Sequence, residues 1–475
     1  MSKPNVVLCQ CDQMRAFAVG CYGNSFVNTP YIDRLASQGV RFDQAVTNNP
    51  VCTPARACLL SGQYSRTCAG TSDNVFIDPP KPQRTRLRDT TVAEAFQQAG
   101  YNTALIGKWH TWGHPNLVGF EESVFPCTAH RHYGQRYFEN FDTEGFVVDQ
   151  FAPDFESARV RDYLREHRGG EGDPFFLHYN ISPPHSPVGP GNASPWYHDM
   201  YLPDDIPLRD NVFIDGEMAY SERWFKIYTI WDYFTRWMEK PTDRLPEGMT
   251  LRHLVAWYYG MVTMVDDMIG RLTSALEAFD LAENTIVVFH SDHGDNLGSH
   301  GMFNKQCLYE ESIRIPLIFR MPGRNASKTN IAQVAQTIDI MPTLLELCDL
   351  SVPDAVQGRS LKPILDGNSD TLADNAAVIE TDANFFGRPC LGIRTPTHLY
   401  GMKLTEDARH IEQEAAWFFD LGQDPYEMNN LVETGGQAAL ATELRERLRD
   451  WHVATPWLAD GGEAGPLREP PFLAR

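Results

Sequence analysis

The chain has 475 residues, a formal net charge of -21, and 42% hydrophobic and 22% charged residues. This length suits a large α/β domain with a smaller companion, and the composition is that of a globular protein. The negative charge argues against nucleic acid as a partner, and no stretch is apolar and long enough to span a membrane.

The chain starts with Met-Ser-Lys-Pro-Asn and enters a predicted strand without a charged segment followed by an apolar run. We therefore expect a cytoplasmic protein with reduced thiols. The 10 cysteines show no repeated zinc spacing, and we interpret most of them as small buried hydrophobes. The sequence leaves open whether the chain forms a homo-oligomer.

The first half of the chain alternates strand and helix patterns. The apolar run 5–11 predicts a central parallel strand. Residues 29–36 combine a threonine N-cap, a proline at the first helical position and apolar residues at helical spacing. Residues 40–46 predict the next strand. This order is typical of a doubly wound α/β fold with a mostly parallel sheet.

Several predicted strands end in polar side chains. Besides the strand at 5–11, these are the runs 102–106, 175–181 and 285–290. Ligands of open α/β sheets gather beyond the carboxyl ends of the strands. We therefore expect one site to hold the polar residues at these ends: Asp12, Lys108, His110, His185, Asp292 and His293.

The remaining chain predicts an insertion, a long helix and a second domain. We expect the aromatic-rich stretch 190–250 to form a small satellite core beneath a long loop or, alternatively, an aromatic wall beside the active site. Residues 258–279 predict a long helix. Short strand patterns and a final helix follow residue 365, so we divide the chain into a large α/β domain, 1–365, and a C-terminal subdomain with a small antiparallel sheet, 366–475.

The segment 52–62 predicts a short helix with an anion pocket at its start. Thr53 suits the N-cap, Pro54 the first helical position and Gly62 the stop. Cys52 would then lie where free N–H groups favour an anion, and Arg56 follows one turn later. The alternative is a capped core helix with a buried cysteine.

This segment resembles the signature of the type I sulfatases, Cys-x-Pro-x-Arg followed by Leu, Ser or Thr, and Gly. In that family a formylglycine-generating maturation enzyme oxidises the cysteine to formylglycine, whose hydrate is the nucleophile. The resemblance therefore implies this role for Cys52, with Arg56 beside it. It also implies an alkaline-phosphatase-like fold, with residues 1–365 as the catalytic domain and a small C-terminal α+β subdomain.

The resemblance also implies a divalent metal. Asp12 with Gln13 is similar to the first acidic pair of the family, and Asp292 with His293 is similar to the second. Together with Cys52 they are the expected ligands. Calcium is the first choice because it prefers oxygen ligands, and Mn²⁺ or Mg²⁺ come next; the histidine nitrogen and the amide leave the identity of the metal open. For Gln13 a hydrogen bond at the strand end is an equal alternative.

Four further residues match family positions that hold sulfate oxygens or protonate the leaving group. Lys108 and His110 lie in a Gly-Lys-Trp-His stretch, His185 follows a proline-rich strand end, and Lys305 ends a Gly-x-x-x-Lys stretch. Judged without the family, Lys108 would be a solvated loop residue and His185 a loop histidine with a local partner.

Two more residues are candidates for binding the substrate. Asn74 alternatively forms a turn, and His300 alternatively packs against the protein. Neither lies in a motif that decides between these roles.

The sequence thus predicts a hydrolase for a sulfate monoester of a sugar, aryl or alkyl alcohol. One alternative is a phosphonate monoester or phosphodiester hydrolase with the same nucleophile and metal. Such relatives tend to lack the Gly-Lys-Trp-His stretch, so Lys108 and His110 favour sulfate. The other alternative is a binding protein that keeps an unmodified Cys52.

Overall fold

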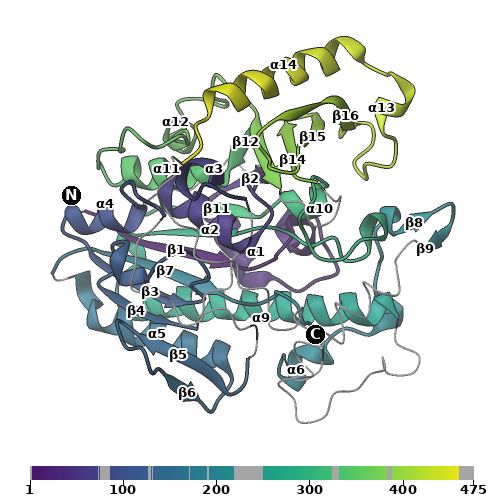
Figure 1. The fold of residues 1–475 in the computed structure, drawn as a ribbon. Coiled ribbons are helices and arrows are strands. Elements are labelled where there is room, and N and C mark those ends of the chain that lie inside the picture. Colours follow the sequence, from purple (N-terminus) through teal and green to yellow (C-terminus); the bar gives the residue numbers. More distant parts are fainter. Residues whose placement is uncertain are drawn as a thin grey trace.

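A sheet of ten strands runs through the molecule in the order β12-β2-β11-β10-β1-β7-β3-β4-β5-β6 (Figure 1). The computed structural model describes residues 3–72, 74, 86–126, 130, 132–170, 172–189, 192–218, 250–323, 331–381 and 388–458. Strands β11 and β5 run against their neighbours, and the central strands β10, β1, β7, β3 and β4 are parallel.

The elements have the following bounds. The strands are β1 Asn5–Cys11, β2 Val40–Val46, β3 Asn102–Gly107, β4 Glu122–Phe125, β5 Gln135–Glu139, β6 Phe146–Val148, β7 Phe175–Ile181, β8 Phe213–Ile214, β9 Glu217–Met218, β10 Thr285–Ser291, β11 Leu317–Arg320, β12 Ile331–Gln336, β13 Ala377–Thr381, β14 Cys390–Arg394, β15 His398–Leu404 and β16 Ile411–Asp420. The helices are α1 Pro30–Ser37, α2 Cys52–Ser61, α3 Ser65–Cys68, α4 Val92–Gln98, α5 Ala152–Glu166, α6 Pro195–His198, α9 Leu251–Ala278, α10 Glu310–Ile313, α11 Ile340–Leu347, α12 Lys362–Leu365, α13 Leu431–Thr434 and α14 Ala438–Ala454.

Helices cover both faces of the large sheet. Alternate side chains of β1 point to opposite faces, as in any strand. Val7 and Cys9 join the core formed with α1, α5 and α9. Val6 and Leu8 join the core formed with α2, α4 and α11. The central strands are therefore buried on both sides, which explains their nearly continuous apolar sequence.

A second, antiparallel sheet has the order β13-β14-β15-β16. Helix α14 lies along this sheet (Figure 1). One face of the sheet packs against α14 through Leu444 and Leu448. The other face packs onto the large domain, where Trp417 and Phe419 share a core with Val46. The predicted mostly parallel sheet with flanking helices and a separate small antiparallel sheet is confirmed.

Several expected elements agree with the structure, and one needs correction. The strands at 5–11, 40–46 and 175–181 have the predicted bounds. The helix predicted at 258–279 begins earlier, at Leu251, because Thr250 and His253 form a capping box there. Among the described residues, no helix is long and apolar enough to cross a membrane.

The aromatic insertion is only partly within the described residues. Tyr197 and Tyr201 belong to the core beneath α9, which agrees with the satellite-core interpretation. The aromatic residues between 219 and 249 lie outside the described residues.

Candidate active site

Four neighbouring strands end at one edge of the large sheet. β10, β1, β7 and β3 are adjacent and parallel, so their carboxyl ends lie together. Cys11 pairs with Ser291 across β1 and β10, which places the following residues, Asp12 and Asp292, side by side. Lys108 follows β3 at the same edge. The cluster that was predicted from the strand ends therefore forms.

Cys52 is the first residue of α2 and not, as predicted, the residue before an N-cap threonine. The extended Val51 is the N-cap. The hydroxyl of Thr53 does not cap the helix. The Oγ1 of Thr53 donates to Oδ1 of Asn74 at 2.6 Å, and the backbone N of Thr53 donates to the same oxygen at 3.2 Å. Asn74 therefore satisfies one of the N–H groups at the start of this helix. Its predicted contact with the substrate remains a prediction.

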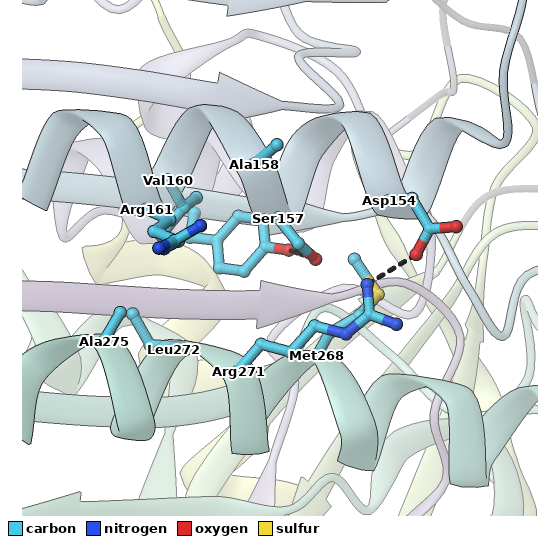
Figure 2. Close-up of a pocket in the computed structure, with 10 residues that line it drawn as sticks. Asp154, Ser157, Ala158, Val160, Arg161, Met268, Arg271, Leu272 and Ala275 are labelled. Carbon is cyan, nitrogen blue, oxygen red and sulfur yellow. Dashed lines mark hydrogen bonds and ion pairs between the residues drawn. The ribbon is translucent and has the colours of Figure 1, made fainter. Parts of the chain in front are cut away.

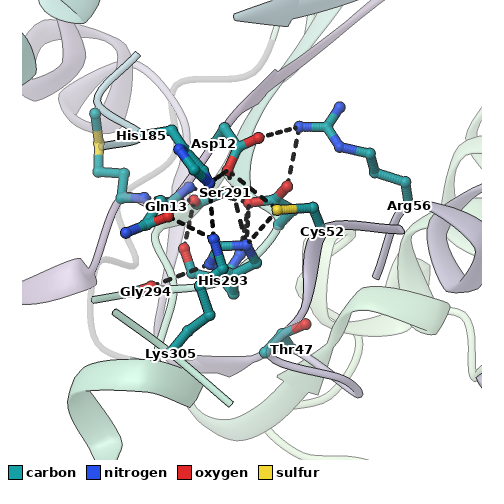
Figure 3. Close-up of polar contacts among 12 residues, drawn as sticks. Asp12, Gln13, Thr47, Cys52, Arg56, His185, Ser291, His293, Gly294 and Lys305 are labelled. Atoms are coloured by element: carbon teal, nitrogen blue, oxygen red, sulfur yellow. Dashed lines mark hydrogen bonds and ion pairs between the residues drawn. The ribbon is translucent and has the colours of Figure 1, made fainter. Parts of the chain in front are cut away.

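A buried carboxylate and a buried imidazole lie against the thiol of Cys52 (Figure 3). The Sγ of Cys52 lies 3.7 Å from Oδ1 of Asp12 and 3.2 Å from Nε2 of His293. Nη2 of Arg56 donates to Oδ2 of Asp12 at 3.0 Å and to Oδ2 of Asp292 at 2.9 Å. All of these side chains are almost fully excluded from water. Arg56 thus holds the two acids together at the base of the site.

Two lysines complete the site. The Nζ of Lys108 contacts the carboxylate of Asp12, and the Nζ of Lys305 donates to Nε2 of His185 at 2.8 Å. Lys108 is 0% and His185 5% exposed, so the alternative of Lys108 as a solvated loop residue is wrong. His185 and Lys305 approach Asp12 from the side opposite Arg56 (Figure 3), and Lys108 shares the Oδ2 of Asp12 with Arg56.

Gln13 is engaged by neighbouring side chains. Its Oε1 accepts a hydrogen bond from Lys305 at 2.6 Å, and its Nε2 donates to Asp295. Its backbone N donates to Oδ1 of Asp292 at 3.0 Å. These contacts are those of a hydrogen-bonding residue at the strand end, and metal ligation by Gln13 remains a prediction.

The surrounding charges favour the anionic form of Cys52. Burial and Asp12 act to raise the pKa of this thiol, but Lys305 and Lys108 outweigh them and hold it well below its usual value. Burial also opposes ionisation of Asp12, yet Lys108 leads the cations that keep its pKa well below normal. Burial and the charge of Asp12 raise the pKa of Asp292. Negative charge is therefore only partly compensated between the two acids.

The donor set fits a divalent cation. Asp12, Cys52, Asp292 and His293 offer donor atoms that all lie within 4.8 Å of one another. The Nδ1–H of His293 donates to the carbonyl of Gly294 at 3.0 Å, so Nε2 is left to face the site, as in metal-binding histidines. The Sγ of Cys52 stands where an oxygen of an oxidised side chain would lie. Two carboxylates and one imidazole suit a divalent ion.

The two other predicted histidines differ in position. His110 is buried next to Cys52: burial lowers its pKa, and a hydrogen bond with that thiol acts in the opposite direction. His300 accepts from Nδ2 of Asn211 at 3.1 Å and stacks on the ring of Tyr309 at 3.8 Å. These are the contacts of the packing alternative for His300, and its role in substrate binding remains a prediction.

His130 lies in this site although the sequence did not predict it. Its ring lies parallel to that of His185, with the centroids 3.5 Å apart, and its Nε2 lies 3.2 Å from Nζ of Lys108. It lies outside the sequence motifs that carry the family resemblance. The only signal was a pair of histidines two residues apart, and the second, His132, binds Asn192 instead.

A separate cavity of about 200 Å³ lies between α5 and α9 (Figure 2). An ion pair between Asp154 and Arg271 spans it, and the hydroxyl groups of Ser157 and Tyr179 lie 3.3 Å apart beside it. Its lining includes none of the predicted site residues. The cavity is therefore distinct from the cluster around Cys52.

A mostly parallel sheet between helical layers, with acidic strand ends gathered on Cys52, defines an alkaline-phosphatase-like hydrolase. The model of the sulfatase family matches residues 4–350, and a model described as N-sulphoglucosamine sulphohydrolase, C-terminal, matches residues 298–454. The chain belongs to the sulfatase family and is a sulfuric ester hydrolase.

Known relatives agree with this membership. The chain is 32% identical to the ulvan-active sulfatase of Formosa agariphila, over 94% of this chain and 80% of the relative. It is 30% identical to the N-acetylglucosamine-6-O-sulfatase of Bacteroides thetaiotaomicron, over 94% and 86%. A protein solved in complex with its substrate D-glucosamine-2-N,6-O-disulfate has a TM-score of 0.80 and 26% identity, covering 94% of this chain and 97% of that one.

Proposed function

We propose that hydrolysis takes place at Cys52 after a maturation enzyme has oxidised this residue to formylglycine. The observation that carries the proposal is the convergence of Asp12, Cys52, Asp292 and His293 within 4.8 Å, at the start of a helix. A formylglycine hydrate would supply a nucleophilic oxygen close to the present Sγ position. The charged groups around it favour an anion there.

A divalent cation, calcium in our proposal, would be held by Asp12, Asp292 and His293. When bound, it would neutralise charge on the sulfate oxygens and on the two acids. Arg56 donates to both carboxylates through one nitrogen, so it fixes the separation at which they face the ion. Gln13 would orient Lys305 through its Oε1 and remains a candidate ligand.

Lys108 and Lys305 would hold the sulfate group. Both amino groups lie beside residues of the acidic centre, and both side chains are buried at 0% and 5% exposure. An ammonium group in a buried site interacts strongly with sulfate oxygens because water screens it little. The two lysines would therefore orient the sulfur for attack from the Cys52 position.

A histidine would protonate the leaving oxygen. His185 and His110 are the candidates, and both are buried next to the centre. Nδ1 of His185 lies 2.5 Å from the backbone carbonyl of Ser186, which can only accept, so Nδ1 carries a proton. Nε2 accepts a hydrogen bond from Lys305 at 2.8 Å, so it would take up the proton of this ammonium group before passing one to the leaving oxygen.

We further propose a sulfated carbohydrate as substrate. The support comes from the relatives, one active on ulvan, one named for N-acetylglucosamine-6-O-sulfate and one solved with a disulfated glucosamine. The imidazole and lysine side chains around Cys52 suit an anionic ester in a protein whose net charge is -21. Aryl and alkyl sulfates remain the simpler probes.

The test uses protein coexpressed with a formylglycine-generating enzyme. Initial rates are measured with 4-nitrophenyl sulfate, with a phenylphosphonate monoester and with a panel of sulfated monosaccharides, and Cys52→Ala serves as the control. The proposal expects turnover of sulfate esters, a preference for sulfate over phosphonate and no turnover by Cys52→Ala. A strong phosphonate preference, or equal activity of Cys52→Ala, would overturn it.

A further inference from the structure

His130 joins the site through two contacts. Its Nε2 lies 3.2 Å from the Nζ of Lys108, and its Nδ1 lies 3.4 Å from the Oγ of Ser182. The side chain is 6% exposed, and its ring is tilted by only 3° from the ring of His185. A buried imidazole with two polar contacts and a parallel partner has little freedom to rotate.

The contacts define which nitrogen carries the proton. A lysine amino group only donates, so Nε2 of His130 accepts from Lys108. Nδ1 then carries the hydrogen and donates to Ser182. The second lysine repeats this pattern, since Nε2 of His185 accepts from Lys305 at 2.8 Å. Each lysine of the site is thus held by one histidine, and the two histidines stack on each other.

This arrangement matters because Lys108 has a strong competing partner. Its Nζ also contacts the carboxylate of Asp12, one of the residues that would hold the cation. The contact with Asp12 alone would leave the amino group free to turn about this carboxylate. Nε2 of His130 at 3.2 Å gives the amino group a second acceptor and so fixes the direction in which it points.

We propose that His130 is a positioning residue that acts through Lys108, holding its amino group where it meets a sulfate oxygen. The proposal rests on the proposed function of Lys108. The stacked His185 keeps the His130 ring at the required angle. A displaced lysine would bind sulfate in a poorer geometry, and misplacement by about 1 Å lowers turnover by about 100-fold.

A double-mutant cycle tests this role. His130→Leu removes the acceptor at similar size, and His130→Gln keeps an acceptor oxygen near the Nε2 position. We expect kcat for 4-nitrophenyl sulfate to fall by about 100-fold in His130→Leu and to recover at least in part in His130→Gln. In the Lys108→Ala background, His130→Leu should change kcat by no more than about 2-fold.

The matched control is His114→Gln. His114 is another buried histidine, stacked on Phe141 and bonded to the backbone of Asn116, and it should keep wild-type kcat. Equal losses from His130→Leu in both backgrounds would indicate a structural role and overturn the proposal. Wild-type kcat in His130→Leu, or a His130→Gln as impaired as His130→Leu, would also overturn it.

A second readout does not require activity. In ¹⁵N-histidine NMR, the two ring-nitrogen signals that disappear in His130→Gln are those of His130. Their chemical shifts should be those of a neutral ring with the hydrogen on Nδ1. A hydrogen on Nε2 would contradict the contact with Lys108 and overturn the proposal. If wild-type protein hydrolyses no sulfate ester, the proposed function fails, and the NMR result still decides whether His130 holds Lys108.

Discussion

Nη2 of Arg56 donates to Oδ2 of Asp292 at 2.9 Å, and the same nitrogen lies 3.0 Å from Oδ2 of Asp12. One guanidinium therefore compensates two buried acids. Removing one partner of a buried ion pair leaves uncompensated charge, which costs about 3–5 kcal/mol. We expect Arg56→Ala to lower the free energy of unfolding by this amount in urea titrations.

The control for this prediction is Arg34→Ala. Arg34 pairs with Glu277 at 3.1 Å, but both side chains are more than half exposed, at 58% and 55%. Exposed pairs contribute only about 0–1 kcal/mol. Equal unfolding free energies for Arg56→Ala and Arg34→Ala would contradict the role of Arg56 as the bridge between the acids.

Lys108→Ala should damage turnover more than folding. The lysine contacts Asp12, but Arg56 still compensates this acid when the lysine is removed. We expect kcat/KM for an aryl sulfate to fall by about 10²–10⁴-fold, the range for a positioned charged or proton-transferring group. Lys362→Ala, which removes another lysine with a carboxylate partner, should have wild-type kinetics. A soluble, fully active Lys108→Ala would refute this role.

Chelation should lower both activity and the melting temperature of the matured enzyme. Without a cation, the negative charges of Asp12 and Asp292 face each other and are only partly compensated by neighbouring cations. Burial and the charge of Asp12 accordingly raise the pKa of Asp292. A ligand present at 100- to 1,000-fold above its Kd stabilises a protein by about 3–4 kcal/mol. Differential scanning calorimetry before and after metal removal measures the loss.

The variant Asp292→Asn provides the comparison for chelation. It removes one of the two facing charges, so its melting temperature should respond less to chelation than that of the wild type. Unchanged activity and melting temperature of the wild type after exhaustive metal removal would contradict the metal site.

Glu156 should make stability depend on pH. Burial raises its pKa from 4.5 to about 8, although the hydroxyl of Tyr137 donates to it at 2.8 Å. The folded state therefore holds this proton more tightly than the unfolded state. The contribution to stability is fully present below about pH 4.5 and is lost as the pH rises to about 8.

The measurement is urea unfolding of the wild type and of Glu156→Gln between pH 5 and 8. Glutamine keeps a hydrogen-bond acceptor for Tyr137 and does not titrate, so the decline in stability with rising pH should be smaller in the variant. Identical pH profiles for both proteins would show that Glu156 ionises equally in the folded and unfolded states.

Much of the site was predictable because several of its residues lie at the carboxyl ends of strands. Asp12, Asp292 and Lys108 each follow a buried strand directly, and parallel strands bring such positions together. His130 was not predictable in this way. Its place depends on a stack with His185, and ring stacking between distant segments leaves no periodic pattern in the sequence.

The sequence predicted which helices and strands exist better than it predicted where they begin and end and how the strands pair. The strand Asn5–Cys11 agrees because an apolar run bounded by polar residues is a strong signal. The start of α2 differs because Thr53 binds Asn74, a tertiary contact that overrides a local N-cap preference. The antiparallel β11 was missed, since strand direction depends on pairing with β10 and β2 and not on composition.

The most direct test of the account is mass spectrometry of the peptide that carries Cys52, from protein produced with a formylglycine-generating enzyme. The account predicts the mass of formylglycine at this position and sulfate-ester turnover in proportion to the converted fraction. A peptide with an intact cysteine thiol, from a preparation that hydrolyses sulfate esters at full rate, would contradict it.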